Sequence, residues 1–317
     1  MDLLKKAARN AVKHCLAIKP KEKVLIITDE PLRKIGYYFF EAAKEAGAEV
    51  VLTEIVSRTR NGEEPPSPVA ELMKLFEVLI IPTSKSLSHT KARREACQQG
   101  ARCATLPGIL ADTMKRTLNA DYSKIAERSN RVGNALQGGR VIHLKSKAGT
   151  DITFSMEGRN PHPDTGIVHS PGHFSNLPAG EAYLAPVEGT AQGVMVIDGA
   201  MAGVGKVKRP IKMRVKDGFV VEISGGPEAN KLRKLLEPVG QLAYNVAELG
   251  IGTNDKAKII GSVLEDEKVL GTVHMAIGDN MSMGGKVSVP SHLDGIMMKP
   301  TLEVDGRVIM RDGALKL

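Results

Sequence analysis

Two histidines and an aspartate near the C-terminus have the chemistry and the spacing of metal ligands. They are His274, His292 and Asp294, in the segment GTVHMAIGDNMSMGGKVSVPSHLDGIMM. His292 and Asp294 are two residues apart, so on a strand they share one face and present an imidazole and a carboxylate to one ion. His274, in a β-like run ending at Gly278, completes a set of two histidines and one carboxylate. The alternative is a pair of satisfied core histidines, but the surrounding glycines and small polar residues suit the close approach of a ligand.

Two glutamates extend this set. Glu181 lies between NLPAG and AYLAP, where a loop becomes a strand, and Glu248 lies in the apolar, glycine-rich segment AELGIG. A carboxylate is costly to bury without a partner, which can be a metal ion, an arginine or a helix N-terminus. Two histidines and three carboxylates exceed the needs of one ion with an open position. They suit two ions that share a bridging carboxylate, as in two-metal hydrolases.

His89 marks a second candidate region, in the segment SLSHTKARREA. It follows an expected strand, and ligand sites of open α/β sheets gather at the carboxyl ends of strands. Ser84, Ser86, Ser88 and Thr90 could line such a crevice together with His89. Capping of the following helix by Ser88 or Thr90 is the favoured explanation.

The segment from residue 160 to 173 holds three more histidines. His162 and Asp164 form an H-x-D pair that could bind a metal, but the local sequence NPHPDTG is rich in turn formers, so a turn is the simpler explanation. His169 and His173 lie on either side of Pro171-Gly172, which argues against a pair on one helical turn.

The first part of the chain alternates between helical and strand patterns. Helices are expected at about residues 4–18 and 32–46, and strands at residues 23–28, 49–55, 77–82 and 101–106. Strands separated by helices indicate βαβ units. Right-handed crossovers then predict a small doubly wound parallel sheet, an α/β domain assigned to residues 1–137.

After a helix at about 121–135 the pattern changes. Strands are expected at 141–144 and 151–154, helices at about 228–236 and 256–264, and hairpins at 211–223 and 302–310 with Asp217-Gly218 and Asp305-Gly306 at their turns. We therefore assign residues 138–317 to an α+β domain with mostly antiparallel strands that carries the metal site.

The composition restricts partners and compartment. The chain has 317 residues and a formal net charge of +8, but its lysines and arginines are dispersed and aromatic residues make up 3%, which leaves no stacking platform for nucleic acid. Cys15, Cys97 and Cys103 do not form a disulfide framework, so we expect reduced thiols. No apolar segment is long enough to cross a membrane, and the N-terminus does not resemble a signal peptide. A cytoplasmic protein is expected.

Four ordered blocks resemble a known superfamily. FSNLPAGEAYLAP, NVAELGIGTN, VHMAIGDN and HLDGIM are similar to the thermophilic, M29-type metalloaminopeptidases, and the resemblance spans most of the chain. Related proteins include 2,5-dihydroxypyridine 5,6-dioxygenase, a mononuclear iron enzyme. The resemblance implies that Glu181, Glu248, His274, His292 and Asp294 are metal ligands, and that relatives are often dimers.

One position departs from the peptidase pattern. The peptidases have a tyrosine seven residues after the first histidine, where this chain has Met281. A thioether supplies neither a phenolic ligand nor a proton donor. In the dioxygenase branch, His274, His292 and Asp294 are the residues used.

These observations favour a metal-dependent aminopeptidase that removes N-terminal residues from small peptides by metal-activated water, with Glu248 and Glu181 as catalytic groups. It would use one or two ions of Zn, Co or Mn and is expected to be a homodimer. The first alternative is a mononuclear Fe(II) ring-cleaving dioxygenase. The second is a non-catalytic relative, which would purify without stoichiometric metal.

Overall fold

The computed structural model describes residues 2–317, which divide into two compact units. The first contains the chain as far as Ala126 together with Thr165–Ala179, and the second contains Glu127–Asp164 and Gly180–Leu317. The chain therefore enters the second unit within helix α6 (Tyr122–Leu136), whereas the sequence places a single boundary after residue 137. It returns to the first unit because strand β8 (Phe174–Asn176) pairs with that unit's sheet.

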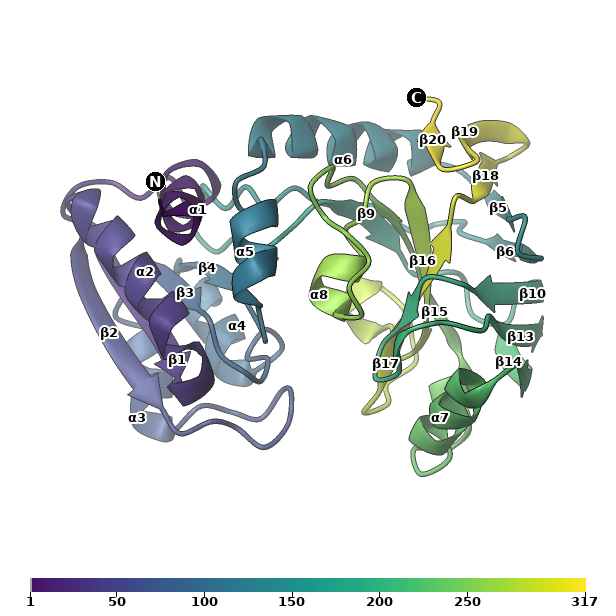
Figure 1. Cartoon of the computed structure of the whole chain (residues 1–317), viewed down its shortest axis with the longest axis horizontal. Helices are drawn as coiled ribbons and strands as arrows, with labels where there is room; N and C mark the ends of the chain where they lie inside the picture. Colours follow the sequence, from purple (N-terminus) through teal and green to yellow (C-terminus); the bar gives the residue numbers. More distant parts are fainter. Residues whose placement is uncertain (1) are drawn as a thin grey trace. The chain divides into compact units, whose positions relative to one another are not determined.

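The first unit is built on a parallel sheet, as the alternating pattern predicts (Figure 1). Its strands lie in the order β2-β1-β3-β4-β8, with β1 at Lys23–Asp29, β2 at Glu49–Ile55, β3 at Val78–Ile81 and β4 at Arg102–Thr105. Residues 24–27 and 78–81 are fully buried, as expected of apolar strands in a parallel sheet covered on its faces.

Short helices precede and connect these strands. They are α1 (Leu3–Asn10), which continues into the π-helix η1 (Ala11–Cys15), the 3-10 helix η2 (Glu30–Leu32), α2 (Arg33–Glu45), α3 (Ser67–Met73), α4 (Lys91–Gln98) and α5 (Ala111–Thr117). Cys15, Cys97 and Cys103 are buried, and the described residues contain no disulfide that involves them. None of the helices formed by residues 2–317 is long and apolar enough to cross a lipid bilayer.

The second unit contains two antiparallel sheets, which confirms the α+β class expected for this half. One sheet has the order β14-β13-β10-β6-β5-β18-β19-β20. Its strands are β5 (Val141–Lys145), β6 (Asp151–Ser155), β10 (Gln192–Ile197), β13 (Ile211–Lys216), β14 (Phe219–Ser224), β18 (Thr301–Val304), β19 (Arg307–Arg311) and β20 (Ala314–Leu315). Both expected hairpins are present, as β13–β14 and β18–β19.

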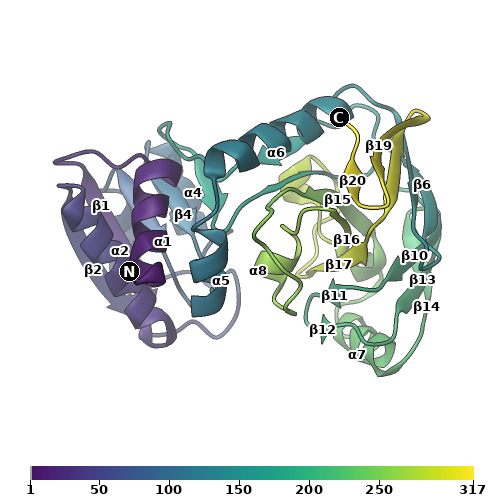
Figure 2. The same ribbon diagram turned by 45° about the horizontal axis from the view of Figure 1, so that its top comes forward.

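The other sheet has the order β12-β11-β17-β16-β15-β9-β7. Its strands are β7 (His162–Asp164), β9 (Glu181–Leu184), β11 (Ala200–Met201), β12 (Gly205–Lys206), β15 (Val246–Gly252), β16 (Thr272–Gly278) and β17 (His292–Met298). Apolar side chains of the two sheets share one core, which α7 (Pro227–Leu236) also joins through Leu232 and Leu236. Figure 2 shows α7 beside β13 and β14.

One expected helix is wrong. Residues 256–262 are not helical, and the helix α8 covers only Val263–Asp266. Carboxylates replace helical hydrogen bonding here, because Asp266 accepts from the N–H groups of Ile260 and Gly261 and Glu265 accepts from that of Lys258. Gly261 also has a positive φ of 91°, which a helix does not accommodate. Two more 3-10 helices, η3 (Gln241–Tyr244) and η4 (Met281–Met283), lie in this unit.

Candidate metal centre

The register of the second sheet brings the five expected ligands to one face. Glu248 pairs with Ala276, which in turn pairs with Asp294 on β17. Alternate residues of a strand share a face, so His274 and His292 project from the same side as this row. Glu181 opens β9 opposite Gly252, four residues beyond Glu248, and falls on that face too. Segments separated by more than a hundred residues thus build one cluster.

The ligand atoms approach one another closely within this cluster. The Nε2 atom of His274 lies 3.3 Å from Oε1 of Glu248 and 3.3 Å from Oε2 of Glu181. The Nε2 atom of His292 lies 3.1 Å from Oε2 of Glu248 and 3.4 Å from Oδ1 of Asp294. Glu248 therefore stands between the two imidazoles and offers one oxygen to each.

The orientation of His292 is fixed by the backbone. Its Nδ1 atom lies 2.7 Å from the carbonyl oxygen of Asp279. A carbonyl only accepts hydrogen bonds, so Nδ1 carries a hydrogen, and Nε2 is the nitrogen that becomes available to a metal ion once its own proton is displaced. This is the arrangement by which proteins orient a histidine that binds a metal through Nε2.

The orientation of His274 depends on a glycine of the neighbouring strand. Gly250 pairs with His274, and a Cβ atom at residue 250 would lie 2.0 Å from the histidine Nε2 atom. The imidazole therefore lies across the backbone of β15 in space that only glycine leaves open. In the glycine-rich segment around Glu248, Gly250 is thus the residue that leaves room for the imidazole.

Electrostatics couples the buried acids and histidines. Burial acts to raise the pKa of Glu248, but hydrogen bonds from His274 and His292 outweigh it and hold that pKa below its usual range. Burial acts to lower the pKa of His274, yet the neighbouring carboxylates raise it to about 9. Burial raises the pKa of Glu181 to about 8, against the opposing effect of Lys268. A divalent cation that binds here must displace the histidine protons.

The donor set fits a divalent metal ion. Among residues 2–317, three groups have ligand atoms within 4.8 Å of one another: Glu181–Glu248–His274, Glu248–His292–Asp294 and Glu267–His274–Asp294. Ligands about 2.1 Å from one ion and at right angles lie roughly 3.0 Å apart, close to the nitrogen–oxygen distances observed. Oε2 of Glu181, which is buried, has no hydrogen-bond partner among residues 2–317. Each group contains one of the two histidines, and the groups are joined through Glu248, His274 and Asp294.

A buried lysine beside the cluster is not apparent from the sequence. The Nζ atom of Lys268 lies 2.6 Å from Glu181 Oε1, 2.6 Å from Glu267 Oε1 and 3.9 Å from Asp164 Oδ2. Burial acts to lower the pKa of Lys268, but these carboxylates raise it well above its usual range. The acidic run Glu265-Asp266-Glu267 ahead of the lysine is the available signal, but it does not reveal that the ammonium is buried.

The structure does not assign a ligand to the region around His89. Thr90 caps α4 by accepting from the N–H of Arg93, as the favoured explanation requires. Ser88 is buried and hydrogen-bonds to Thr105 and Asn176, at the carboxyl ends of β4 and β8. Its hydroxyl therefore serves the internal packing of the first unit.

The histidines of residues 160–173 lie outside the metal groups. His162 stacks on Tyr183 with ring centroids 5.4 Å apart, and His169 contacts the backbone carbonyl of His14. Asp164 alone approaches the cluster, through Lys268. Met281, at the position of the peptidase tyrosine, lies on η4 with 53% of its surface exposed.

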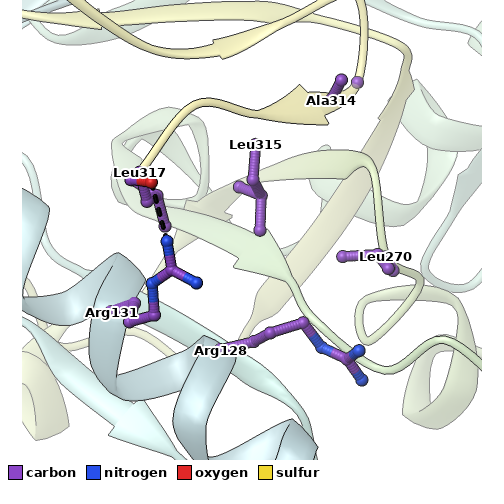
Figure 3. A pocket seen from close by; sticks show the side chains of 7 residues that line it. Arg128, Arg131, Leu270, Ala314, Leu315 and Leu317 are labelled. Atoms are coloured by element: carbon purple, nitrogen blue, oxygen red, sulfur yellow. Dashed lines mark hydrogen bonds between the residues drawn. The ribbon is translucent and has the colours of Figure 1, made fainter.

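A pocket of about 300 Å³ also lies in the second unit (Figure 3). It is lined by Arg128, Arg131, Leu270, Gly313, Ala314, Leu315 and Leu317. Arg131 donates a hydrogen bond to the Leu317 carbonyl across it. None of the lining residues belongs to the metal groups, so we do not assign the pocket to the candidate centre.

Two solved structures share the fold of this chain. A structure of 2,5-dihydroxypyridine dioxygenase from Pseudomonas putida KT2440 matches with a TM-score of 0.85 at 18% identity, covering 98% of this chain and 96% of the other. AmpT from Thermus thermophilus, an M29 aminopeptidase, matches with a TM-score of 0.73 at 18% identity and 99% coverage of both chains. At 18% identity, these two matches show the fold that the chain shares with both proteins.

The sequence comparisons are more specific. The family described as NicX, 2,5-dihydroxypyridine 5,6-dioxygenase, matches residues 3–317, and the chain belongs to this family. The 2,5-dihydroxypyridine 5,6-dioxygenase of Pseudomonas putida is 26% identical over 196 residues, which cover 56% of this chain and 55% of that protein. The match thus spans about half of the relative's length. These findings favour the dioxygenase alternative over the aminopeptidase.

Proposed function

We propose that this chain is a mononuclear Fe(II)-dependent dioxygenase that cleaves a hydroxylated pyridine or a similar electron-rich ring. The observation that carries the proposal is the convergence of His274, His292 and Asp294 on one face of the sheet, in a chain that belongs to the NicX family over residues 3–317. Two histidines and one carboxylate that leave positions open are typical of non-haem Fe(II) oxygenases.

The side chains of this cluster would have different roles in such a site. His274 and His292 would bind iron through Nε2 and Asp294 through a carboxylate oxygen. A bound Fe(II) would supply redox catalysis, and the electrons that reduce O₂ would come from the ring that is cleaved. The Asp279 carbonyl holds His292 in the required tautomer. Glu248, beside both Nε2 atoms, is placed to give a further ligand atom to the same ion. Burial of Glu248 and His274 shields these two side chains from bulk water.

The proposal is tested by loading metal-free protein with Fe(II) under anaerobic conditions and following O₂ consumption with 2,5-dihydroxypyridine. We expect consumption of one O₂ per ring cleaved in the wild type. His292→Ala should lose bound iron and at least about 100-fold in rate, because a ligand is removed. His143→Ala is the matched control, since His143 pairs with Asp151 outside the cluster and should leave both quantities unchanged. Iron-loaded wild type that consumes no O₂ with any hydroxylated pyridine contradicts the proposal.

A dinuclear aminopeptidase is the second candidate. The observation in its favour is that the groups Glu181–Glu248–His274 and Glu248–His292–Asp294 share Glu248, as two ions with a bridging carboxylate require. In that enzyme Glu248 and Glu181 would be the catalytic carboxylates. Hydrolysis of aminoacyl amides by protein loaded with Zn, Co or Mn, without O₂ consumption by the iron form, would select it. Protein that retains no metal at all would indicate a non-catalytic relative.

A further inference from the structure

The side chain of Lys268 lies deep in the second unit and touches the edge of the metal cluster. It is 2% exposed, and it follows α8 in the loop that leads to β16. An ammonium group is costly to remove from water unless carboxylates surround it. Glu181 and Glu267, each 2.6 Å away, provide that compensation, with Asp164 further off at 3.9 Å.

The carboxylates that hold this ammonium are also candidate metal ligands. Glu181 belongs to the group Glu181–Glu248–His274, and Glu267 belongs to the group Glu267–His274–Asp294. In both Glu181 and Glu267, the Oε1 atom is the one that the lysine Nζ atom contacts. The third group, Glu248–His292–Asp294, includes no carboxylate that Lys268 contacts within 4 Å among the described residues.

The positive charge of Lys268 therefore affects the three ligand groups unequally. Two of the three groups already share a carboxylate with a fixed positive charge, which repels a divalent cation brought to the other oxygen of the same carboxylate. The remaining group meets no such charge, and His274 adjoins it through Glu248 at 3.3 Å. The ammonium thus binds the carboxylates that would otherwise neutralise the charge of a second metal ion in a dinuclear centre.

We infer that Lys268 restricts the centre to a single metal ion by binding, as a permanent cation, the carboxylates of Glu181 and Glu267 that a second ion would need. Glu181 is then a partner of the lysine and not a required ligand of the bound ion. This inference rests on the proposed metal site but not on the reaction that the site catalyses.

The test is the number of ions per folded chain. Metal-free protein is titrated with Mn²⁺ in a calorimeter, and the content after desalting is measured by elemental analysis. We expect one ion in the wild type and two in Lys268→Met, because Glu181 and Glu267 become available. Lys147→Met is the matched control, since Lys147 is exposed on the surface and pairs only weakly with Asp312. It should bind one ion with unchanged affinity.

A second variant covers the case in which Lys268→Met does not fold. Glu181→Gln should still bind one ion, with affinity within about threefold of the wild type, because the group Glu248–His292–Asp294 holds it. Two ions in the wild type, a folded Lys268→Met that still binds one, or an ion lost from Glu181→Gln each overturn the inference. O₂ consumption is recorded on the same samples. A wild type with one ion but no O₂ consumption therefore contradicts the proposed reaction and leaves the role of Lys268 intact.

Discussion

The imidazole of His274 occupies space that a side chain on the neighbouring strand would otherwise fill. Gly250 lies opposite it in the antiparallel register, and the ring crosses the backbone there. At the scale of the residue, the metal centre thus depends on the missing side chain at Gly250 as well as on its ligands. His292 is fixed differently, by a hydrogen bond from Nδ1 to the Asp279 carbonyl.

Gly250→Ala should therefore remove metal without removing a ligand. The added methyl would meet the His274 ring at 2.0 Å, so the imidazole must rotate away, and we expect at least a tenfold loss of metal affinity by calorimetry. Gly295→Ala, next to Asp294, is the control, because its methyl meets the side chains of Ile197 and Met201. These can shift, so metal affinity should stay within about threefold. Equal affinities in the two variants would show that the ring is not held by residue 250.

Two hairpin turns with similar sequences differ in their surroundings. Asp217-Gly218 joins β13 and β14, and Asp305-Gly306 joins β18 and β19; all four residues have positive φ, as type I′ turns require. At the scale of the element, the dipeptide alone predicts both hairpins. It does not predict that Gly218 packs against the backbone of Gly189, whereas Gly306 faces open space.

Replacement of each glycine by alanine separates the cost of a positive φ from the cost of a close contact. Gly306→Ala meets only backbone strain and should lower the free energy of unfolding by about 1 kcal/mol. Gly218→Ala adds a methyl 2.5 Å from the backbone nitrogen of Gly189, so its loss should be larger, about 3 kcal/mol. Urea denaturation of both variants measures the difference. Similar losses would mean that the loop around Gly189 yields without cost.

At the scale of the whole molecule, an ion pair joins distant parts of the first unit. Arg102, at the start of β4, donates to both carboxylate oxygens of Glu22, at 2.8 Å and 2.9 Å, just ahead of β1. Both side chains are close to fully buried. Burial acts to raise the pKa of Glu22, but the hydrogen bonds from Arg102 and from the N–H of Lys19 outweigh it and lower that pKa.

This pair should make stability depend on pH. Because the pKa of Glu22 is lower in the folded chain than in the unfolded chain, its contribution is present above about pH 4.5 and is lost as pH falls through the folded value. Glu22→Gln should cost about 2–3 kcal/mol at pH 7 and little once the wild-type carboxylate is protonated. Glu71→Gln, which removes an exposed carboxylate that pairs with Lys74, should cost under about 0.5 kcal/mol at either pH. Denaturation curves at both pH values test this; a pH-independent cost would contradict it.

The residue types and their local patterns determined much of this protein. Apolar runs such as Lys23–Asp29 fixed the parallel strands, Asp-Gly pairs fixed two hairpins, and the two-residue spacing of His292 and Asp294 placed both on one face. These properties depend on periodicity and turn chemistry, which act over a few residues. Spacing and local setting marked candidate ligands in the same way, and the resemblance to a known superfamily implied the full set of five, but neither shows which of them share an ion.

Only the tertiary structure decided which groups meet. The pairing of β8 with β4 returns Thr165–Ala179 to the first unit, and the order β17-β16-β15-β9 aligns acids and histidines from four segments. The burial of Lys268 against Glu181 follows from that alignment, not from the local sequence around either residue. Such contacts depend on long-range sheet register, which no short segment encodes, and it is they that place a fixed cation beside the candidate metal centre.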